Sequence, residues 1–217
     1  VAALTTEQVQ AIETQDIAVL KSTQIAALTT DGVASLTTAQ VQALNTAQIQ
    51  AITTAGFAAM TTEQVAAIET RDIAVLKTTQ VDALTTSAIA ALTTSQIQAV
   101  TSMQVQYFAT SGLAAMTTEQ IAAIETRDVA ALRTTQVAAL TTEAIAALTT
   151  AQAQAVTSAG IAVLNTSQVV AIGTEQVAAL TTAQVQAITT AGVAALTTEQ
   201  VQAIETQDIA VLKSTQI

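Results

Sequence analysis

"LTTEQVQAIETQDIAVLKSTQIAALTTDGVASLTTAQVQA", residues 4–43, consists of successive eight-residue units, and the same frame continues without an insertion to Ile217. The first position of each octad is Leu, Ile, Val or Met, with one Phe at Phe108. The third position is Thr or Ser in every octad, the fifth is usually Gln, the sixth usually Val or Ile, and the eighth usually Ala. A fixed internal period of this kind is typical of repeat architectures.

The octad predicts one short helix per unit and excludes one long helix. Eight residues advance about 800° around a straight helix, so the apolar stripe would drift about 80° with each unit. The segment from the fourth position to the next first position is rich in helix formers. The apolar residue at the sixth position and the one at the next first position are three apart, so a helix places them on one face.

Thr at the third position is a good candidate for the helix N-cap, because its hydroxyl can accept a bond from a free backbone N–H. Acidic residues often follow it, where the helix dipole favours a negative charge. The predicted structural caps are Thr6, Thr14, Thr62, Thr70, Thr118, Thr126, Thr198 and Thr206.

The predicted fold class is therefore all-α, a solenoid or superhelix of short helices of one to two turns. The alternative is a β-solenoid with ladders of Thr and Gln, in which the sixth and eighth positions point inward. Two large aliphatic side chains contribute about 1.5–3 kcal/mol each, less than the roughly 12 kcal/mol needed to order eight residues. In either fold, octads must therefore gain stability by stacking on their neighbours.

Composition limits the function. Apolar residues make up 51% and aromatic residues 1%, and the chain contains no Cys, His, Trp or Pro. The net charge of −10, with six basic residues, argues against a nucleic-acid partner, because phosphates require clustered Lys and Arg. Polar Thr and Gln interrupt every apolar run, so no membrane span is expected. The larger side chains Phe57, Met60, Met103, Tyr107 and Phe108 are interpreted as enlarged core positions.

A longer period lies over the octads. The motif Ile-Glu-Thr-(Gln/Arg)-Asp begins at Ile12, Ile68, Ile124 and Ile204. The first three copies are seven octads apart, and the last follows after ten. In each case a second-position Glu is followed one octad later by a Lys or Arg, and we expect these charges to pair between neighbouring coils. The predicted ion pairs are Glu13–Lys21, Glu69–Lys77, Glu125–Arg133 and Glu205–Lys213.

The longest period relates the two ends. Residues 1–25 and 193–217 are identical, and the second copy begins twenty-four octads after the first. The sequence therefore predicts a single continuous solenoid over residues 1–217, cut as a window from a longer periodic chain.

No arrangement in the sequence predicts chemistry. Without His or Cys, the usual nucleophilic triads and zinc sites cannot form, and no catalytic, cofactor-binding or metal-binding residue is predicted. The paired carboxylates Glu13/Asp16 and their repeats do not form a calcium loop. Single Gly residues replace Gln at the fifth position and are interpreted as sites of local curvature.

The phrase LTTxQVxA resembles the tandem octapeptide stretches of very long bacterial surface or secreted proteins of the adhesin kind. The resemblance implies an elongated stalk, spacer or fibre at the cell exterior and no functional residues. We expect a structural protein without enzymatic activity, small-molecule substrate or cofactor, which associates end to end or laterally. The alternative is a binding module that uses rows of Thr or carboxylates to hold ice, a glycan or calcium.

Overall fold

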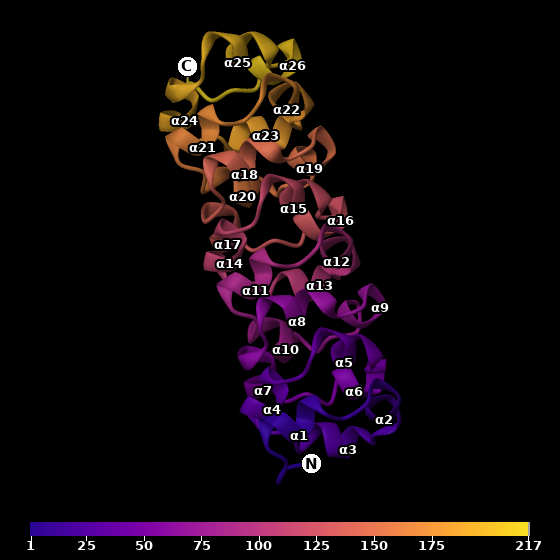
Figure 1. Ribbon diagram of the computed structural model, residues 1–217. Helices are drawn as coiled ribbons and strands as arrows, with labels where there is room; N and C mark the ends of the chain where they lie inside the picture. Colours follow the sequence, from indigo (N-terminus) through magenta and orange to yellow (C-terminus); the bar gives the residue numbers. More distant parts are fainter. Residues whose placement is uncertain (217) are drawn as a thin grey trace. The chain divides into compact units, whose positions relative to one another are not determined.

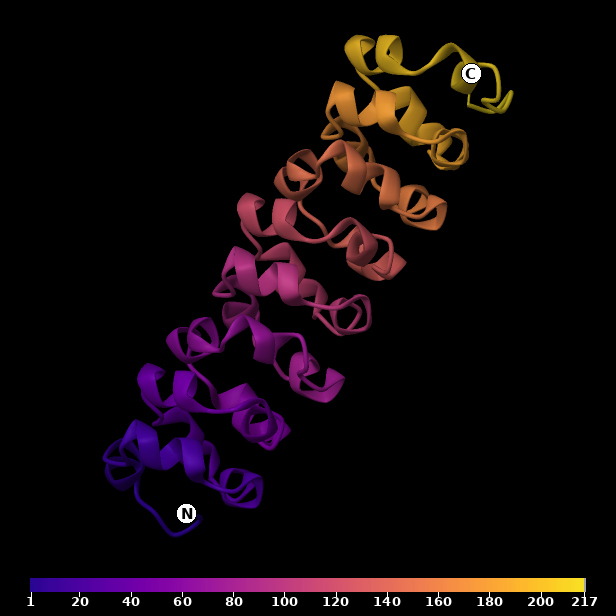
Figure 2. The same ribbon diagram turned by 90° about the vertical axis from the view of Figure 1, so that its right-hand side faces the viewer.

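The computed structural model describes residues 1–216, and in this range it contains 26 short helices and no strand. The all-α fold with one helix per octad is confirmed, and the β-solenoid is not favoured. The chain divides into two compact units, unit 1 over Val1–Ala115 and unit 2 from Met116 onward. Within each unit, short helices follow one another around stacked coils (Figures 1 and 2). A single continuous solenoid over residues 1–217 stays a prediction.

The helices of unit 1 are α1 (Thr6–Gln10), α2 (Thr14–Val19), α3 (Ser22–Ala26), α4 (Thr30–Ala34), α5 (Thr38–Ala43), α6 (Thr46–Ile49), α7 (Thr54–Ala59), α8 (Thr62–Ala67), α9 (Thr70–Ile73), α10 (Thr78–Asp82), α11 (Thr86–Ala90), α12 (Thr94–Ala99), α13 (Ser102–Val105) and α14 (Thr110–Ala114). Those of unit 2 are α15 (Thr118–Ala123), α16 (Thr126–Val129), α17 (Thr134–Ala138), α18 (Thr142–Ala147), α19 (Thr150–Ala155), α20 (Ser158–Ala162), α21 (Thr166–Val170), α22 (Thr174–Ala179), α23 (Thr182–Ala187), α24 (Thr190–Ala195), α25 (Thr198–Ala203) and α26 (Thr206–Ile209).

The helix caps lie one residue earlier than the sequence predicts. At α8, Thr61 has the extended backbone of an N-cap (φ −74°, ψ 164°), and its hydroxyl accepts a bond from the N–H of Gln64 at 3.2 Å. Thr62 is the first helical residue. The reason is geometric: an N-cap oxygen reaches the N–H three residues later, which is the fifth position when the cap is the second.

The eight predicted caps are thus wrong as caps, since Thr6, Thr14, Thr62, Thr70, Thr118, Thr126, Thr198 and Thr206 each begin a helix. The N-caps in these octads are Thr5, Glu13, Thr61, Glu69, Thr117, Glu125, Thr197 and Glu205. The third-position hydroxyl instead faces an adjacent turn in places, as where Thr46 Oγ1 donates to Asp72 Oδ1 at 2.7 Å.

Each helix ends without a left-handed residue. Among residues 1–216, no residue has a positive φ and no peptide bond is cis. After α8, Ile68 is extended (φ −61°, ψ 129°), and the next residue, Glu69, is the extended N-cap of α9. Two extended residues therefore form the turn between these helices. Such a turn requires neither Pro nor a Gly at positive φ, which explains why the chain has no Pro and few Gly.

The core is built from the sixth and first positions, as the three-residue spacing predicts. Val65 is fully buried and Ile68 is 3% exposed, and the same two positions are buried through most of both units, although Val201 and Ile209 near the end of unit 2 are 45% and 38% exposed. Phe57, Met60 and Phe108 are buried as expected, but Met103 and Tyr107 are not: their exposures are 68% and 41%. They occupy the fourth and eighth octad positions, which face outward.

Successive turns of the solenoid bring helices three octads apart into contact. In unit 1, α4 contacts α7 and α11 contacts α14, and in unit 2, α19 contacts α22. Side-chain hydrogen bonds between turns reach back by 28 to 31 residues. One turn therefore takes between three and four octads, close to three and a half.

The cap assignment is tested by substituting the two Thr residues of one octad in turn. We expect Thr61→Ala to lower the free energy of unfolding by about 1 kcal/mol, because an N-cap hydroxyl is lost. Thr62→Ala, the matched control, is expected to cost less than half as much. Urea unfolding followed by circular dichroism measures both, and a larger loss for Thr62→Ala would contradict the assignment.

Candidate functional site

The fifth-position Gln is the residue on which most polar contacts converge. Gln64 Oε1 accepts a bond from the backbone N–H of Thr61, its own N-cap, at 2.8 Å. Its Nε2 donates to the carbonyls of Val33 at 2.9 Å and Leu36 at 2.6 Å, at the end of a helix one turn earlier. One buried side chain therefore satisfies a backbone N–H at the start of its own helix and two backbone carbonyls at the end of another.

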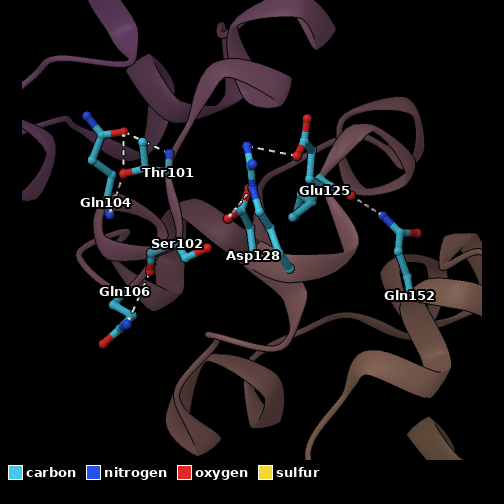
Figure 3. Close-up of polar contacts among 9 residues, drawn as sticks. Thr101, Ser102, Gln104, Gln106, Glu125, Asp128 and Gln152 are labelled. Carbon is cyan, nitrogen blue, oxygen red and sulfur yellow. Dashed lines mark hydrogen bonds and ion pairs between the residues drawn. The ribbon is translucent and has the colours of Figure 1, made fainter.

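The same contact recurs through both units. Gln96 donates to the carbonyls of Val65 and Ile68, and Gln152 to those of Ile121 and Ile124. Figure 3 shows the N-terminal half of the contact at Gln104, whose Oε1 accepts bonds from the N–H and the hydroxyl of Thr101. The buried members are Gln40, Gln48, Gln64, Gln80, Gln96, Gln104, Gln120, Gln136, Gln152, Gln168, Gln176, Gln184, Gln200 and Gln216.

Sequence reasoning missed this role, since it treated Gln only as a helix former. The recurrence of Gln at the fifth position is the signal that could have revealed this role. An exposed helical residue varies freely between repeats, as the fourth position does, whereas Gln returns at the fifth. A buried amide is stable only when its donors and acceptor are bonded, and here they are.

Gly at the fifth position permits close approach between turns. A Cβ built on Gly56 would lie 2.9 Å from Ile52 Cγ2 and 3.1 Å from Val33 Cγ2. On Gly112 it would clash with Ile89 Cδ1. At these Gly residues the Gln bridge is absent, and the helix packs directly against the preceding turn of the solenoid. The Gly residues are therefore contact sites between turns, in addition to any effect they have on curvature.

The charged octads form ion pairs that differ from the predicted ones. Arg127 Nη2 lies 2.8 Å from Glu125 Oε2, and Arg127 Nε lies 3.6 Å from Asp128 Oδ1 (Figure 3). Arg71 pairs in the same way with Glu69, at 2.6 Å, and with Asp72. Both Arg side chains are well exposed, so these pairs contribute little to stability.

Within residues 1–216 none of the predicted ion pairs is present, so Glu13–Lys21, Glu69–Lys77, Glu125–Arg133 and Glu205–Lys213 were wrong. The prediction assumed that residues one octad apart lie side by side on neighbouring coils. The lateral neighbour lies instead about three and a half octads away, and a residue one octad on occupies the next corner of the same turn.

In the same octads, Asp takes the place of the bridging Gln. Asp72 and Asp208 are 1% and 2% exposed, and a carboxylate cannot donate to the carbonyls one turn earlier. Asp72 accepts a bond from Thr46 and lies beside Arg71. At Asp208 the Arg is replaced by Gln207, which donates to Glu205, and Asp208 Oδ1 has no hydrogen-bond partner among the described residues.

Five glutamates in the first turn of their helices have a pKa below the ordinary value of 4.5. The chief cause is a hydrogen bond from the residue's own backbone N–H, followed by bonds from the two Thr side chains before it. The residues are Glu7, Glu63, Glu119, Glu143 and Glu199. This agrees with the expected preference of the helix start for negative charge.

The structure has a small apolar cavity and larger open hollows on its surface, one of about 440 Å³ beside Glu69, Thr70 and Arg71. An apolar cavity of about 20 Å³ lies in unit 2, where Ala153 occupies a sixth position otherwise filled by a larger side chain, and it is about the size of one water molecule. Among residues 1–216, no group of three or more carboxylates is placed to hold a metal ion. In this range, too, the helices are all too short or too polar to cross a bilayer.

A model of the ALTTAQ repeat matches the sequence at residues 9–46, 38–67, 65–102, 121–158, 154–187 and 170–204. Together the matches cover residues 9–102 and 121–204, well over half of the chain. They confirm the tandem octapeptide-type repeat region. No curated protein matches the chain.

The Gln bridge is tested by removing one. Gln64→Leu keeps the volume but leaves the N–H of Thr61 and the carbonyls of Val33 and Leu36 without a partner, so we expect a loss of about 2–4 kcal/mol in the free energy of unfolding. Gln42→Leu, at an exposed seventh position, is the matched control and is expected to change stability by less than about 0.5 kcal/mol. Equal effects of the two substitutions in urea unfolding would refute the bridge.

The Asp positions are tested by restoring the bridge. Asp208→Gln places a donor near the carbonyls of Leu180 and Val177, at the same spacing as in the other bridges, and removes a buried carboxylate that lacks a full set of partners. We expect it to raise the free energy of unfolding by about 1–3 kcal/mol. Asp16→Gln, in an exposed fifth position, is the control and should be neutral in the same thermal or urea measurement.

Proposed function

Since this chain belongs to the ALTTAQ repeat family, we propose that the repeats themselves are its function: a structural protein whose stacked octads form an elongated spacer, stalk or filament. The observation that carries the proposal is the Gln bridge. Each bridge joins a helix to the turn before it through the same backbone carbonyls, so each added octad that carries the fifth-position Gln extends the stack by the same contact. The number of octads then sets the length.

The proposal includes no catalytic activity. Gln, the usual residue of the fifth position, is buried in most of the octads that carry it and is bonded to backbone, as at Gln64. Most second-position Thr hydroxyls are engaged as N-caps. The outward fourth position changes from octad to octad, for example Glu63, Arg71 and Thr79, and so gives no repeated geometry for a substrate.

The protein is placed by this proposal outside the cell, at the surface or in a secreted fibre. The support is the resemblance of the octad to repeats of bacterial adhesin-like proteins. The partners are further copies of the chain, and the net charge of −10 disfavours nucleic acid as a partner.

A length series tests the spacer role. A second copy of residues 12–67, which is seven octads, is inserted after Ala67, so that the octad frame continues. Packed helices lie about 8–10 Å apart, so two added turns should lengthen the maximum dimension by roughly 20 Å. Small-angle X-ray scattering measures it.

The control carries an insertion of half an octad at the same site, which breaks the octad frame and should disturb packing without added length. A chain that becomes no longer on insertion of seven octads, or that unfolds, would contradict the proposal. Protease treatment of intact cells of the source organism tests the location, and full protection of the repeats would count against a surface position.

A further inference from the structure

The large exposed apolar side chains of unit 1 are confined to four positions. Val19 is 78% exposed, Val75 37%, Met103 68% and Tyr107 41%. Most other outward positions in the unit carry Ala, Thr, Gln or a charge. Single exposed apolar residues need no explanation, but a group on one face indicates an interaction site.

Val19, Val75 and Met103 lie on one face because their spacing matches the turns of the solenoid, and Tyr107 follows Met103 by half an octad. Seven octads separate Val19 from Val75, which is two turns of three and a half octads each. Ala47 lies halfway between them, in α6. The helices along this face are in contact, α3 with α6, α6 with α9 and α10 with α13, and Gln50 Nε2 donates to Val75 O at 2.6 Å.

The basic residues of unit 1 lie on the same face. Lys21 is the N-cap of α3 and Lys77 that of α10, so each follows an exposed Val by two residues, and Arg71 lies in α9. Figure 1 shows α2, α6 and α9 along one edge of the unit and α4 and α7 along the opposite edge. Asp31, in α4, belongs to that opposite side, which within residues 1–115 carries no basic side chain.

The face carries both signs of charge in a fixed order. Along the chain Glu13 precedes Val19 and Lys21 follows it, and Glu69, Val75 and Lys77 repeat this order. The Glu residues therefore lie on one side of the apolar side chains and the Lys residues on the other. Within the described part of the chain, neither Lys21 nor Lys77 forms an ion pair, whereas Glu69 is paired with the exposed Arg71 on the same face.

We propose that this stripe, defined as Val19, Ala47, Val75, Met103 and Tyr107 with the flanking Glu13, Lys21, Glu69 and Lys77, is the contact surface for a second copy of the chain lying alongside in the same direction. A two-fold axis parallel to the solenoid axis sets Val19 against Val19 and Val75 against Val75 of the two copies. It also sets each Lys column opposite the other copy's Glu column. A two-fold contact uses the same patch on both copies and needs this self-complementarity.

The acidic charge of the chain favours this face over the others for self-association. Two copies that approached through the sides bearing Asp31 would bring their Asp31 carboxylates together with no cation on that side to offset them, and like charges at an interface are unfavourable. The stripe is the face of unit 1 where cations offset the carboxylates and where apolar area is available for burial. This inference rests on the proposed structural role, because it names how spacers of this kind associate laterally.

Sedimentation equilibrium of the full chain at up to about 100 µM detects association down to the micromolar range of weak interfaces. We expect a dimer, and we expect Val19→Ala, Val75→Ala and Met103→Ala together to raise its dissociation constant at least about tenfold. Ala occurs at the same octad positions elsewhere, for example at Ala47 and Ala131, so the variant should fold. A chain that stays monomeric overturns the proposal, whatever the length series shows for the spacer role.

Charge exchange supplies the decisive control. Lys21→Glu with Lys77→Glu, and separately Glu13→Lys with Glu69→Lys, should each abolish self-association, and an equimolar mixture of the two variants should restore a dimer. Asp31→Lys, on the opposite side, is the control and should leave the dissociation constant unchanged. Failure of the mixture to associate would overturn the pairing.

The direction is tested by cross-linking, since the chain has no Cys. Under oxidation Val19→Cys should form a disulfide-linked dimer if the copies are parallel, whereas Asp31→Cys should not. Cross-linking through Cys at position 31 but not at 19 would place the contact on another face.

Discussion

The double use of the fifth-position amide is the constraint on which the rest of this structure depends. A short helix leaves most of its N–H groups and carbonyls without partners inside the helix, so a chain of such helices is unstable unless something satisfies both ends. Gln64 does this for α8 and for the end of α4 one turn earlier. The buried polar layer between successive turns follows from that side chain.

The bridge also explains which departures the repeat tolerates. Gly56 removes the side chain and lets the helices approach, so the lost bonds are offset by packing. Asp72 is also polar, but its carboxylate accepts hydrogen bonds and cannot donate them. It accepts a bond from Thr46 and lies beside Arg71. The motif with Gln in place of Arg loses that support at Asp208. The same octad position thus accepts Gln, Gly and Asp, each with its own surroundings, and also Ala, at the buried Ala88 and Ala144.

Much of the local fold could be predicted from the sequence, and the lateral arrangement could not. The three-residue spacing of Val65 and Ile68 correctly identified the core, and the octad period excluded a long helix. The cap was misplaced by one residue because Thr61 and Thr62 are chemically identical, and only the reach of the hydroxyl to Gln64 distinguishes them. The ion pairs were misassigned because the number of octads in a turn is a property of packing, so Glu69 and Lys77 looked adjacent when they are not. Met103 and Tyr107 were misjudged by size alone, since octad position decides whether a large side chain faces inward.

A turn of half-integral octad number has a consequence for how such a chain can grow by copying its own gene. One octad more or less preserves the local helix but rotates everything beyond it by roughly a quarter of the circumference. Only a block of seven octads closes on itself, returning each surface residue to its original azimuth. The recurrence of Glu13, Val19 and Lys21 as Glu69, Val75 and Lys77 has this block length, so a duplication of that size would copy a surface along with a sequence.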